Sequence, residues 1–179
     1  VDRHVVRNRI DFGTLEFDAD RLSSGGALIF DEGTLGGSSL HSEVFAFEVL
    51  HRCELAALVK TETTIDYLDP AGKKTDILVD IDGFNVGVSV TRAFHWPPDE
   101  PYSLDDAITL LQDKLLDVQL SSANAADSNR WDHAVLHVIA YNDDHANRIE
   151  EAHETIDSDR LGATAVVITT TDGNDAFIY

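Results

Sequence analysis

The chain has 179 residues and is 43% apolar, which is enough for one domain with a hydrophobic core and too short to favour two. Its 33 Asp and Glu against 13 Lys and Arg give a net charge of −20, which disfavours nucleic-acid binding because phosphate contacts depend on Lys and Arg. The sequence contains no apolar run long enough to span a membrane, and we expect no targeting signal at its start.

Residues 1–38 are predicted to form a β extension. Three short runs of strand-like composition, HVVRNRIDF, TLEF and GALIFDE, are separated by Gly13 and by the SSGG of residues 23–26. The GGSS loop of residues 36–39 then offers N-cap residues for a helix in LHSEVFAFEVLHRCELAALVK, whose apolar side chains recur at helical spacing. Cys53 lies in this pattern, so we expect a buried thiol, no disulfide, and an intracellular location in the cytoplasm or nucleus.

A β-hairpin is the strongest local signal in the sequence. TTIDYLD is predicted to be a strand and DPAG a turn, followed by two apolar-rich runs on either side of the Asp-Gly pair at residues 82–83. A two-residue turn sets Ile81 opposite Phe84 and, by the same register, Asp76 opposite Ser89. One face is then apolar and carries Ile77, Val79, Ile81, Phe84, Val86, Val88 and Val90. The other face is small and polar and carries Asp76, Asp80, Asn85, Gly87, Ser89 and Thr91.

Helices and strands alternate in the rest of the chain. HWPPDEPYS holds three of the four prolines and is predicted to be a loop, in which Trp96 either caps the core or stacks on a base. Ser103 begins a helix in LDDAITLLQDKLLDVQL, SSANAADSNR is a polar connection, and WDHAVLHVIAY is a buried strand. DHANRIEEAHETI is predicted to be a helix that Gly162 stops, ATAVVITT the last core strand, and residues 171–179 a ragged tail.

Histidines offer one alternative metal site. His133 and His137 share a face of the predicted strand, but positions i and i+4 of a strand lie about 13 Å apart, too far for one ion. Both histidines are therefore interpreted as structural. The sequence contains no Gly-x-Ser-x-Gly motif, phosphate loop or dinucleotide fingerprint.

The order of the predicted elements resembles the PD-(D/E)xK nuclease superfamily. An opening helix, a three-strand meander, a helix and a further strand occur within residues 39–170, so the resemblance implies a restriction endonuclease-like core in a single domain of residues 1–179. The expected fold class is α/β, a mixed central sheet flanked by helices, with extra N-terminal strands. In that superfamily an Asp begins the second core strand and faces an acid-x-Lys triplet on the third. Asp76 matches the first position, whereas Ser89 and Thr91 stand where the family has its acid and its lysine.

The resemblance implies a site for Mg²⁺ or Mn²⁺ around Asp76. In such a site two carboxylates hold the ion, which polarises a phosphoryl oxygen and lowers the pKa of a bound water. Glu48 resembles the acid that many members carry on the first helix, and Glu43 is the second choice. Asp80, on the polar face of the hairpin, is a third candidate ligand. The expected metal ligands are therefore Asp76, Glu48 and Asp80.

The missing lysine has one main candidate replacement. Lys114 lies one residue past the apolar stripe of its helix, in a context similar to the glutamine-bearing helix of the RecB-like branch, with Gln112 nearby. Its alternative partners are Asp113 and Asp117 on the same helix. Arg92 lies on the opposite face of the hairpin and would need a bulge to take part.

Two functions of different classes follow from these residues. The first is a metal-dependent phosphodiesterase acting on DNA or RNA, with Asp76, Glu48 and Lys114 as its catalytic residues. The second is a catalytically silent descendant that serves as a protein-binding or regulatory domain. The half-missing triplet and the charge of −20 favour the second function, whereas two carboxylates on the correct face of the hairpin favour the first.

Overall fold

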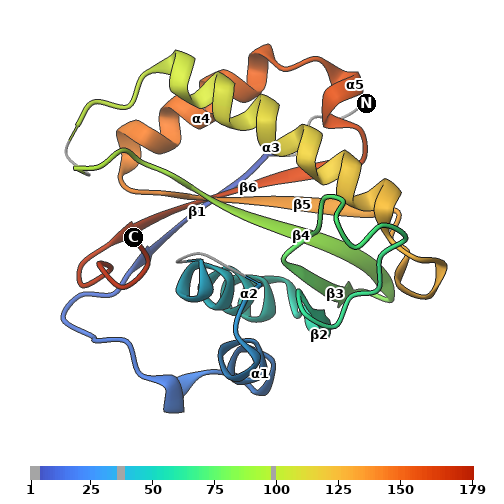
Figure 1. Cartoon of the computed structure of the whole chain (residues 1–179). Helices are drawn as coiled ribbons and strands as arrows, with labels where there is room; N and C mark the ends of the chain where they lie inside the picture. The colour runs from blue at the N-terminus through green and yellow to red at the C-terminus, as the bar shows by residue number, and fades with distance from the viewer. Residues whose placement is uncertain (1–4, 36–38, 98–99) are drawn as a thin grey trace.

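A mixed β-sheet lies at the centre of the molecule, between layers of helices (Figure 1). The computed structural model describes residues 5–35, 39–97 and 100–179, and within them the sheet has six strands in the order β1-β6-β5-β4-β3-β2. The strands are β1 (Val5–Asp11), β2 (Ala57–Thr61), β3 (Ile77–Ile81), β4 (Phe84–Ala93), β5 (His133–Ala140) and β6 (Thr164–Asp172). Strands β1, β6, β5 and β4 are parallel, whereas β3 and β2 continue the sheet in antiparallel fashion. The expected α/β class with a mixed sheet flanked by helices is confirmed.

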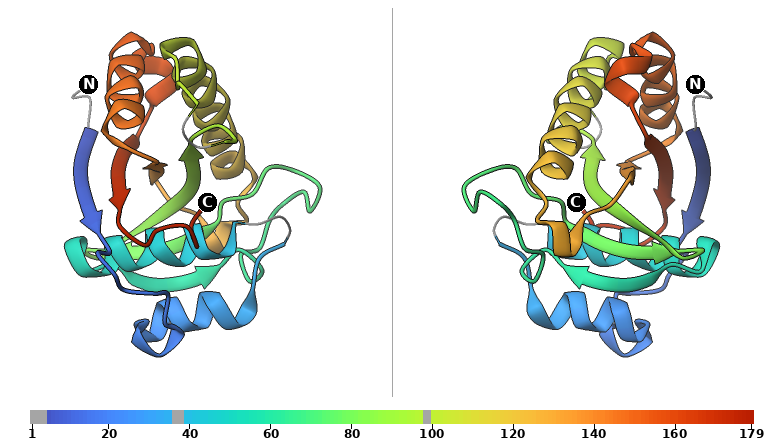
Figure 2. Two further views of the ribbon diagram at one scale, coloured as in Figure 1. Left: turned by 90° about the vertical axis from the view of Figure 1, so that its left-hand side faces the viewer. Right: turned by 90° about the vertical axis from the view of Figure 1, so that its right-hand side faces the viewer.

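Helices cover both faces of this sheet. They are α1 (Ser24–Glu32), α2 (Leu40–Glu54), α3 (Leu104–Asn124), α4 (Asp143–Thr155) and α5 (Ser158–Leu161), with 3₁₀ turns η1 (Ala19–Arg21) and η2 (Asp127–Asn129). Helices α3, α4 and α5 lie on one face, α2 lies on the other, and α1 lies outside α2 (Figures 1 and 2). The core under α3 and α4 includes Leu111, Leu115, Leu136, Val138, Ile149 and Ile168. The core under α2 includes Val44, Phe47, Leu50, Ile77, Val79 and Val88. Across the described ranges, none of the helices combines the length and the hydropathy that a membrane span needs.

The predicted hairpin is confirmed in its turn and in its register as far as Ile77 and Val88, whereas the pair expected between Asp76 and Ser89 is not part of the ladder. Residues 82–83 have φ angles of 54° and 85°, as the two positive-φ positions of a type I′ turn require, and Ile81 pairs with Phe84. The apolar face of the hairpin packs under α2, with one exception. The side chain of Phe84 is 61% exposed and lies beside the ring of His133 at the end of the sheet.

The N-terminal extension differs from its prediction. Only the first run forms a strand, β1, while TLEF has no regular structure and GALIFDE lies in the helix α1. Ser23 caps α1 by accepting the Gly26 N–H at 3.2 Å. A Cβ on Gly25 would lie 2.4 Å from the Phe47 ring, and one on Gly26 would lie 2.2 Å from the Glu48 carboxylate. Close packing of α1 on α2, which local patterns do not reveal, therefore favours a helix here.

The helix predicted from residue 40 is shorter than expected, and the strand expected at TTIDYLD is absent. Helix α2 ends at Glu54, because Leu55 adopts the left-handed conformation with φ of 56°, and the next residues form β2. Residues 62–76, which we call the β2–β3 loop, instead cross to the end of α3 (Figures 1 and 2). There the Leu68 N–H donates to the Asn124 carbonyl at 2.8 Å.

The later elements follow the prediction with three differences. Helix α3 begins after Ser103, whose side chain forms a reciprocal capping box with Asp106, and it continues to Asn124, into the predicted polar connection. The tail is not ragged, since residues 173–179 fold back onto the sheet and Ile178 is only 1% exposed. The short helix α5 follows α4, so Gly162 ends α5 rather than α4.

Other expectations concern single side chains and loops. Cys53 is exposed, so its predicted burial is wrong. Trp96 is 82% exposed and therefore does not cap the core. His137 is buried, with Nε2 2.7 Å from the hydroxyl of Thr169, in agreement with a structural role. Residues 36–38 and 98–99 of the two predicted loops lie outside the described residues.

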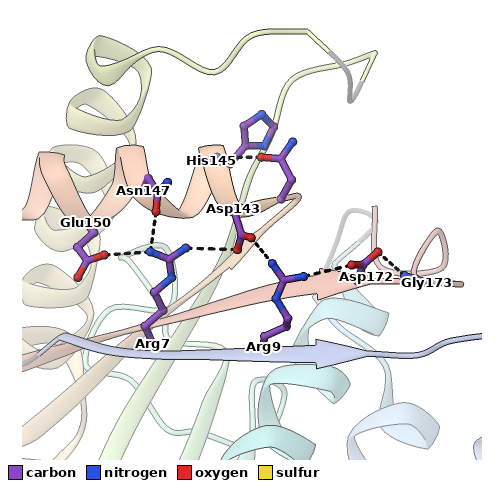
Figure 3. Close-up of polar contacts among 9 residues, drawn as sticks. Arg7, Arg9, Asp143, His145, Asn147, Glu150, Asp172 and Gly173 are labelled. Atoms are coloured by element: carbon purple, nitrogen blue, oxygen red, sulfur yellow. Dashed lines mark hydrogen bonds and ion pairs between the residues drawn. The ribbon is translucent and has the colours of Figure 1, made fainter.

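An ionic network attaches β1 to α4 (Figure 3). Arg7 contacts Asp143 and Glu150, the latter at 3.1 Å, and Arg9 contacts Asp143 and Asp172, the latter at 3.2 Å. Hydrogen bonds and charge from the two arginines hold the pKa of Asp143 below its ordinary value. Because all of these groups are substantially exposed, the network adds to the backbone pairing of β1 with β6 and does not replace it.

We expect Arg9→Ala to speed hydrogen exchange of the β1 amides by up to about fivefold at low salt, the upper range for exposed ion pairs. The difference should shrink in 1 M NaCl, because salt screens exposed charges. Amides of β5 should not change. Arg148→Ala, which removes an ion pair confined to α4, is the control. Unchanged β1 exchange at low salt would contradict this role for the network.

Candidate functional site

The carboxylate of Asp76 lies where β3 and β4 separate. Asp76 directly precedes β3 and is partly buried, and its Oδ2 accepts the Val90 N–H at 2.6 Å. Burial raises the pKa of Asp76 to about 7, the hydrogen bond from Val90 opposes this shift, Glu62 adds to it, and Lys114 opposes it. Strongly shifted carboxyls of this kind occur preferentially at functional sites.

Glu43 of α2 provides a second carboxyl within electrostatic reach of Asp76. Its side chain is 2% exposed, and burial raises its pKa to about 8, with the charge of Asp76 as the next cause. A hydrogen bond with Ser39 opposes the shift, and Glu62 adds to it. Two desolvated carboxyls that repel each other cannot both ionise cheaply, so the pair retains a proton near neutral pH or requires a cation.

Glu48, the helix acid expected at the site, lies elsewhere. Its Oε1 accepts the Ser23 N–H at 2.7 Å, and its Oε2 is 2.7 Å from the guanidinium of Arg52. Burial acts to raise the pKa of Glu48, but the hydrogen bonds from Ser23 and Arg52 outweigh it and hold that pKa below its ordinary value. This corrects the expected ligand set: Glu43, the second choice, is the α2 carboxyl next to Asp76.

Asp80 also lies away from the site. It is four residues from Asp76 along the strand, a separation of about 13 Å. Its Oδ1 accepts the Gly83 N–H at 3.1 Å, so this carboxylate stabilises the hairpin turn. Asp80 is thus removed from the set of candidate ligands.

Lys114 of α3 is within electrostatic reach of Asp76, since its charge acts on the pKa of that carboxyl. The alternative partner Asp117 instead pairs with Lys73 of the β2–β3 loop at 2.8 Å. Gln112 on the same helix is exposed. Of the three predicted catalytic residues, the structure therefore brings two within electrostatic reach of each other: Asp76 at the start of β3 and Lys114 of α3.

Hydroxyl groups occupy the rest of the polar face near Asp76. Thr75 is 2% exposed, and its hydroxyl donates to the Val88 carbonyl at 2.9 Å and lies 3.3 Å from the Ser89 hydroxyl. Thr91 is partly buried two residues further along β4. Arg92 takes no part here, because its guanidinium donates to the Ile178 carbonyl at 3.0 Å. The site thus combines two carboxyls, several hydroxyls and one ammonium.

The donor set determines which metal could bind. Within residues 5–35, 39–97 and 100–179, no group of three or more His, Cys, Asp and Glu side chains is arranged to hold an ion. A structural zinc centre needs four such ligands. Mg²⁺ keeps several waters and is often bound by one or two carboxylates, and Mn²⁺ prefers similar oxygen ligands. The Glu43–Asp76 pair therefore fits a largely hydrated Mg²⁺ or Mn²⁺ ion.

Sequence reasoning ranked Glu48 before Glu43, although the structure places Glu43 within electrostatic reach of Asp76. Glu43 precedes Phe47 by four positions and Leu50 by seven, so it belongs to the stripe that faces the sheet. Glu62 and Tyr67 were not singled out at all, because the β2–β3 loop was predicted to be partly a strand. Glu62 raises the pKa values of Asp76 and Glu43, and the hydroxyl of Tyr67 accepts the N–H of Thr75, the residue before Asp76.

Comparisons with known proteins add one relative. No family model matches the chain, and no solved structure matches it significantly. The AAC-rich mRNA clone AAC4 protein of Dictyostelium discoideum is 39% identical over 123 residues, which cover 65% of this chain. The matched part is 18% of the length of that protein, and the protein's name states no activity.

Proposed function

We propose that this chain is a divergent PD-(D/E)xK-type nuclease domain that binds Mg²⁺ or Mn²⁺ through Glu43 and Asp76 and hydrolyses phosphodiester bonds in DNA or RNA. The Glu43–Asp76 pair, one buried and one partly buried carboxyl whose pKa values are both raised, is the observation that carries the proposal. The order α2, β2–β3–β4, α3, β5 supports it, because the restriction endonuclease-like core has the same succession of elements. An Asp at the start of the second core strand supports it as well.

The residues of the site have distinct roles in this proposal. A bound divalent ion supplies charge stabilisation of the phosphoryl oxygen and lowers the pKa of bound water. Glu43 and Asp76 would hold the ion, which favours the ionised form of both carboxyls and so keeps them as ligands near neutral pH. The ammonium of Lys114 stabilises negative charge on the phosphate. The Ser89 hydroxyl orients water where the family has its acid.

Calorimetric titration with Mn²⁺, together with cleavage assays on labelled single- and double-stranded DNA and RNA, tests the proposal. We expect wild-type protein to bind Mn²⁺ and both Asp76→Asn and Glu43→Gln to weaken binding by roughly tenfold or more, because each loses one carboxylate ligand. Asp80→Asn is the matched control and should bind as wild type does, since Asp80 stabilises the turn. Absence of Mn²⁺ binding by the wild type would refute the proposal.

A catalytically silent domain that binds a protein partner is the second candidate. Ser89 and Thr91 replace the family's acid and lysine, and the charge of −20 repels a nucleic-acid backbone. Mn²⁺ binding at Asp76 without cleavage of any of the four substrates would select this function. In either case an exposed, unpaired Cys53 suits a reducing intracellular compartment.

A further inference from the structure

The β3–β4 ladder ends at the pair Ile77–Val88 and does not reach Val90, whose N–H donates to Asp76. Ile77 pairs with Val88, and the same register, if continued, would set Thr75 opposite Val90. That pair does not form. Instead the Val88 carbonyl accepts both the Asp76 N–H at 3.1 Å and the Thr75 hydroxyl, and the Val90 N–H donates to the Asp76 carboxylate at 2.6 Å. The Asp76 carboxylate thus takes the place of the Thr75 carbonyl, which would accept the Val90 N–H if the ladder continued.

The hydroxyl of Tyr67 accounts for this early end of the ladder. It accepts the Thr75 N–H at 2.8 Å and lies 3.3 Å from the Thr75 carbonyl, to which it donates. These are the two backbone groups that Thr75 would otherwise offer to Val90. Because Tyr67 satisfies both, the Val90 N–H remains available to Asp76.

The rest of the β2–β3 loop fixes the position of Tyr67. Its ring packs with a small buried cluster that consists of Ile65, Leu78, Ala125 and Trp131. Tyr67 also forms an isolated bridge with Ala125, next to the end of α3. Asn124 then holds the loop from both sides, accepting the Asp69 N–H at 2.8 Å and donating to the carbonyls of Asp69 and Lys73 at 2.9 and 3.0 Å.

We propose that Tyr67 is the positioning residue of the site: its hydroxyl ends the β3–β4 ladder at Ile77 and thereby directs the Asp76 carboxylate to the Val90 N–H, beside Glu43. The inference rests on the proposed function only for its catalytic meaning, because the geometry it describes exists without metal or substrate. Without the hydroxyl, Thr75 is expected to pair with Val90 and to displace the carboxylate.

Nuclear magnetic resonance can follow this contact directly. In wild-type protein the Val90 amide proton should shift with pH as the charge of the carboxyl that accepts it changes, because the Val90 N–H donates to Asp76 Oδ2 at 2.6 Å. The charged groups facing that carboxyl are Glu43 from α2, Glu62 from the β2–β3 loop and Lys114 from α3. Asp76→Asn identifies the source of the shift, since it should abolish the titration.

Tyr67→Phe tests the proposal, because it keeps the ring and removes only the hydroxyl. We expect loss of the Val90 titration, while amides of β5 keep their wild-type shifts. Tyr102→Phe is the matched control: Tyr102 is also buried, with a pKa that burial raises to about 12, but it lies before the start of α3. Tyr102→Phe should retain the titration. A Val90 titration in Tyr67→Phe with wild-type amplitude and midpoint would overturn the proposal.

A second variant covers the case in which Tyr67→Phe does not fold. Asn124→Ala loosens the β2–β3 loop without altering Tyr67, so it should reduce the amplitude of the Val90 titration, and an unchanged amplitude would overturn the proposal. The Val90 titrations of both variants are recorded without metal. Loss of the titration in Tyr67→Phe, together with no Mn²⁺ binding by the wild type, would support the positioning role and refute the proposed function. Mn²⁺ binding by the wild type, together with an unaltered Val90 titration in Tyr67→Phe, would support the proposed function and refute the positioning role.

Discussion

Glu43→Gln is expected to raise the free energy of unfolding at pH 8.5 by about 3 kcal/mol more than it does at pH 5.5. Burial raises the pKa of Glu43 from an ordinary 4.5 to about 8, and each pKa unit corresponds to about 1.4 kcal/mol. The folded state binds more protons than the unfolded state between these values, so stability falls as pH rises through this window and the loss is complete above pH 8. Glutamine cannot ionise, so the variant lacks this loss.

Urea denaturation of both proteins at the two pH values measures the effect. Glu48→Gln on the same helix is the control and should have the opposite sign. It replaces a carboxylate that accepts from Ser23 and pairs with Arg52, so we expect it to lower stability by roughly 1–3 kcal/mol at neutral pH. Equal effects of the two substitutions at pH 8.5 would contradict the assignment of Glu43, rather than Glu48, to the neighbourhood of Asp76.

A divalent cation should cancel the pH effect if the proposed function is correct. An ion held by Glu43 and Asp76 favours the ionised form of both carboxyls and so removes the cost of ionising them inside the protein. Repeating the denaturation at pH 8.5 with Mn²⁺ should therefore stabilise the wild type and leave Glu43→Gln nearly unaffected. The result links the acid pair to the metal without requiring any cleavage.

The sequence predicted best those features that depend on neighbouring residues. The hairpin register follows from the Asp-Gly turn and the alternation of side chains, and the structure confirms it from the pair Ile81–Phe84 to the pair Ile77–Val88. The start of α3 likewise follows from Ser103 and Asp106. In each case the signal and the structure it specifies lie within a few residues of each other.

The errors occurred where distant residues decide the conformation. TTIDYLD has strand-like composition, but the partners of its backbone groups are Asn124 and Asn129, about sixty residues later in the chain. GALIFDE has the composition of a strand, but Gly25 and Gly26 pack closely against α2. Helix phase does not separate Glu43 from Glu48, since Glu48 follows the core residue Val44 by four positions, and the contacts with Ser23 and Arg52 decide where Glu48 lies.

Gly87→Ala is expected to be the most damaging single-methyl substitution on the polar face of the hairpin. Trp131 is 4% exposed and its ring lies against Gly87, so an added Cβ would come within 2.5 Å of Cε2 and Nε1. The ring cannot yield easily, because Trp131 packs in a buried cluster with Leu78, and the strand is held by the pairing of Gly87 with Leu78. Overpacking of this kind costs about 2 kcal/mol or more.

Urea denaturation of a double-mutant cycle separates this clash from a general weakness of glycine substitution. Trp131→Leu alone should cost about 3 kcal/mol through the cavity it leaves. Combined with Gly87→Ala, the loss should fall short of the sum by roughly 1–2 kcal/mol, because the smaller side chain relieves the clash. Asn85→Ala, at an exposed position two residues earlier in β4, is the control and should change stability by no more than about 0.5 kcal/mol. Strict additivity would show that the ring of Trp131 does not restrict Gly87, and the packing of the strand that carries Ser89 and Val90 would then need another explanation.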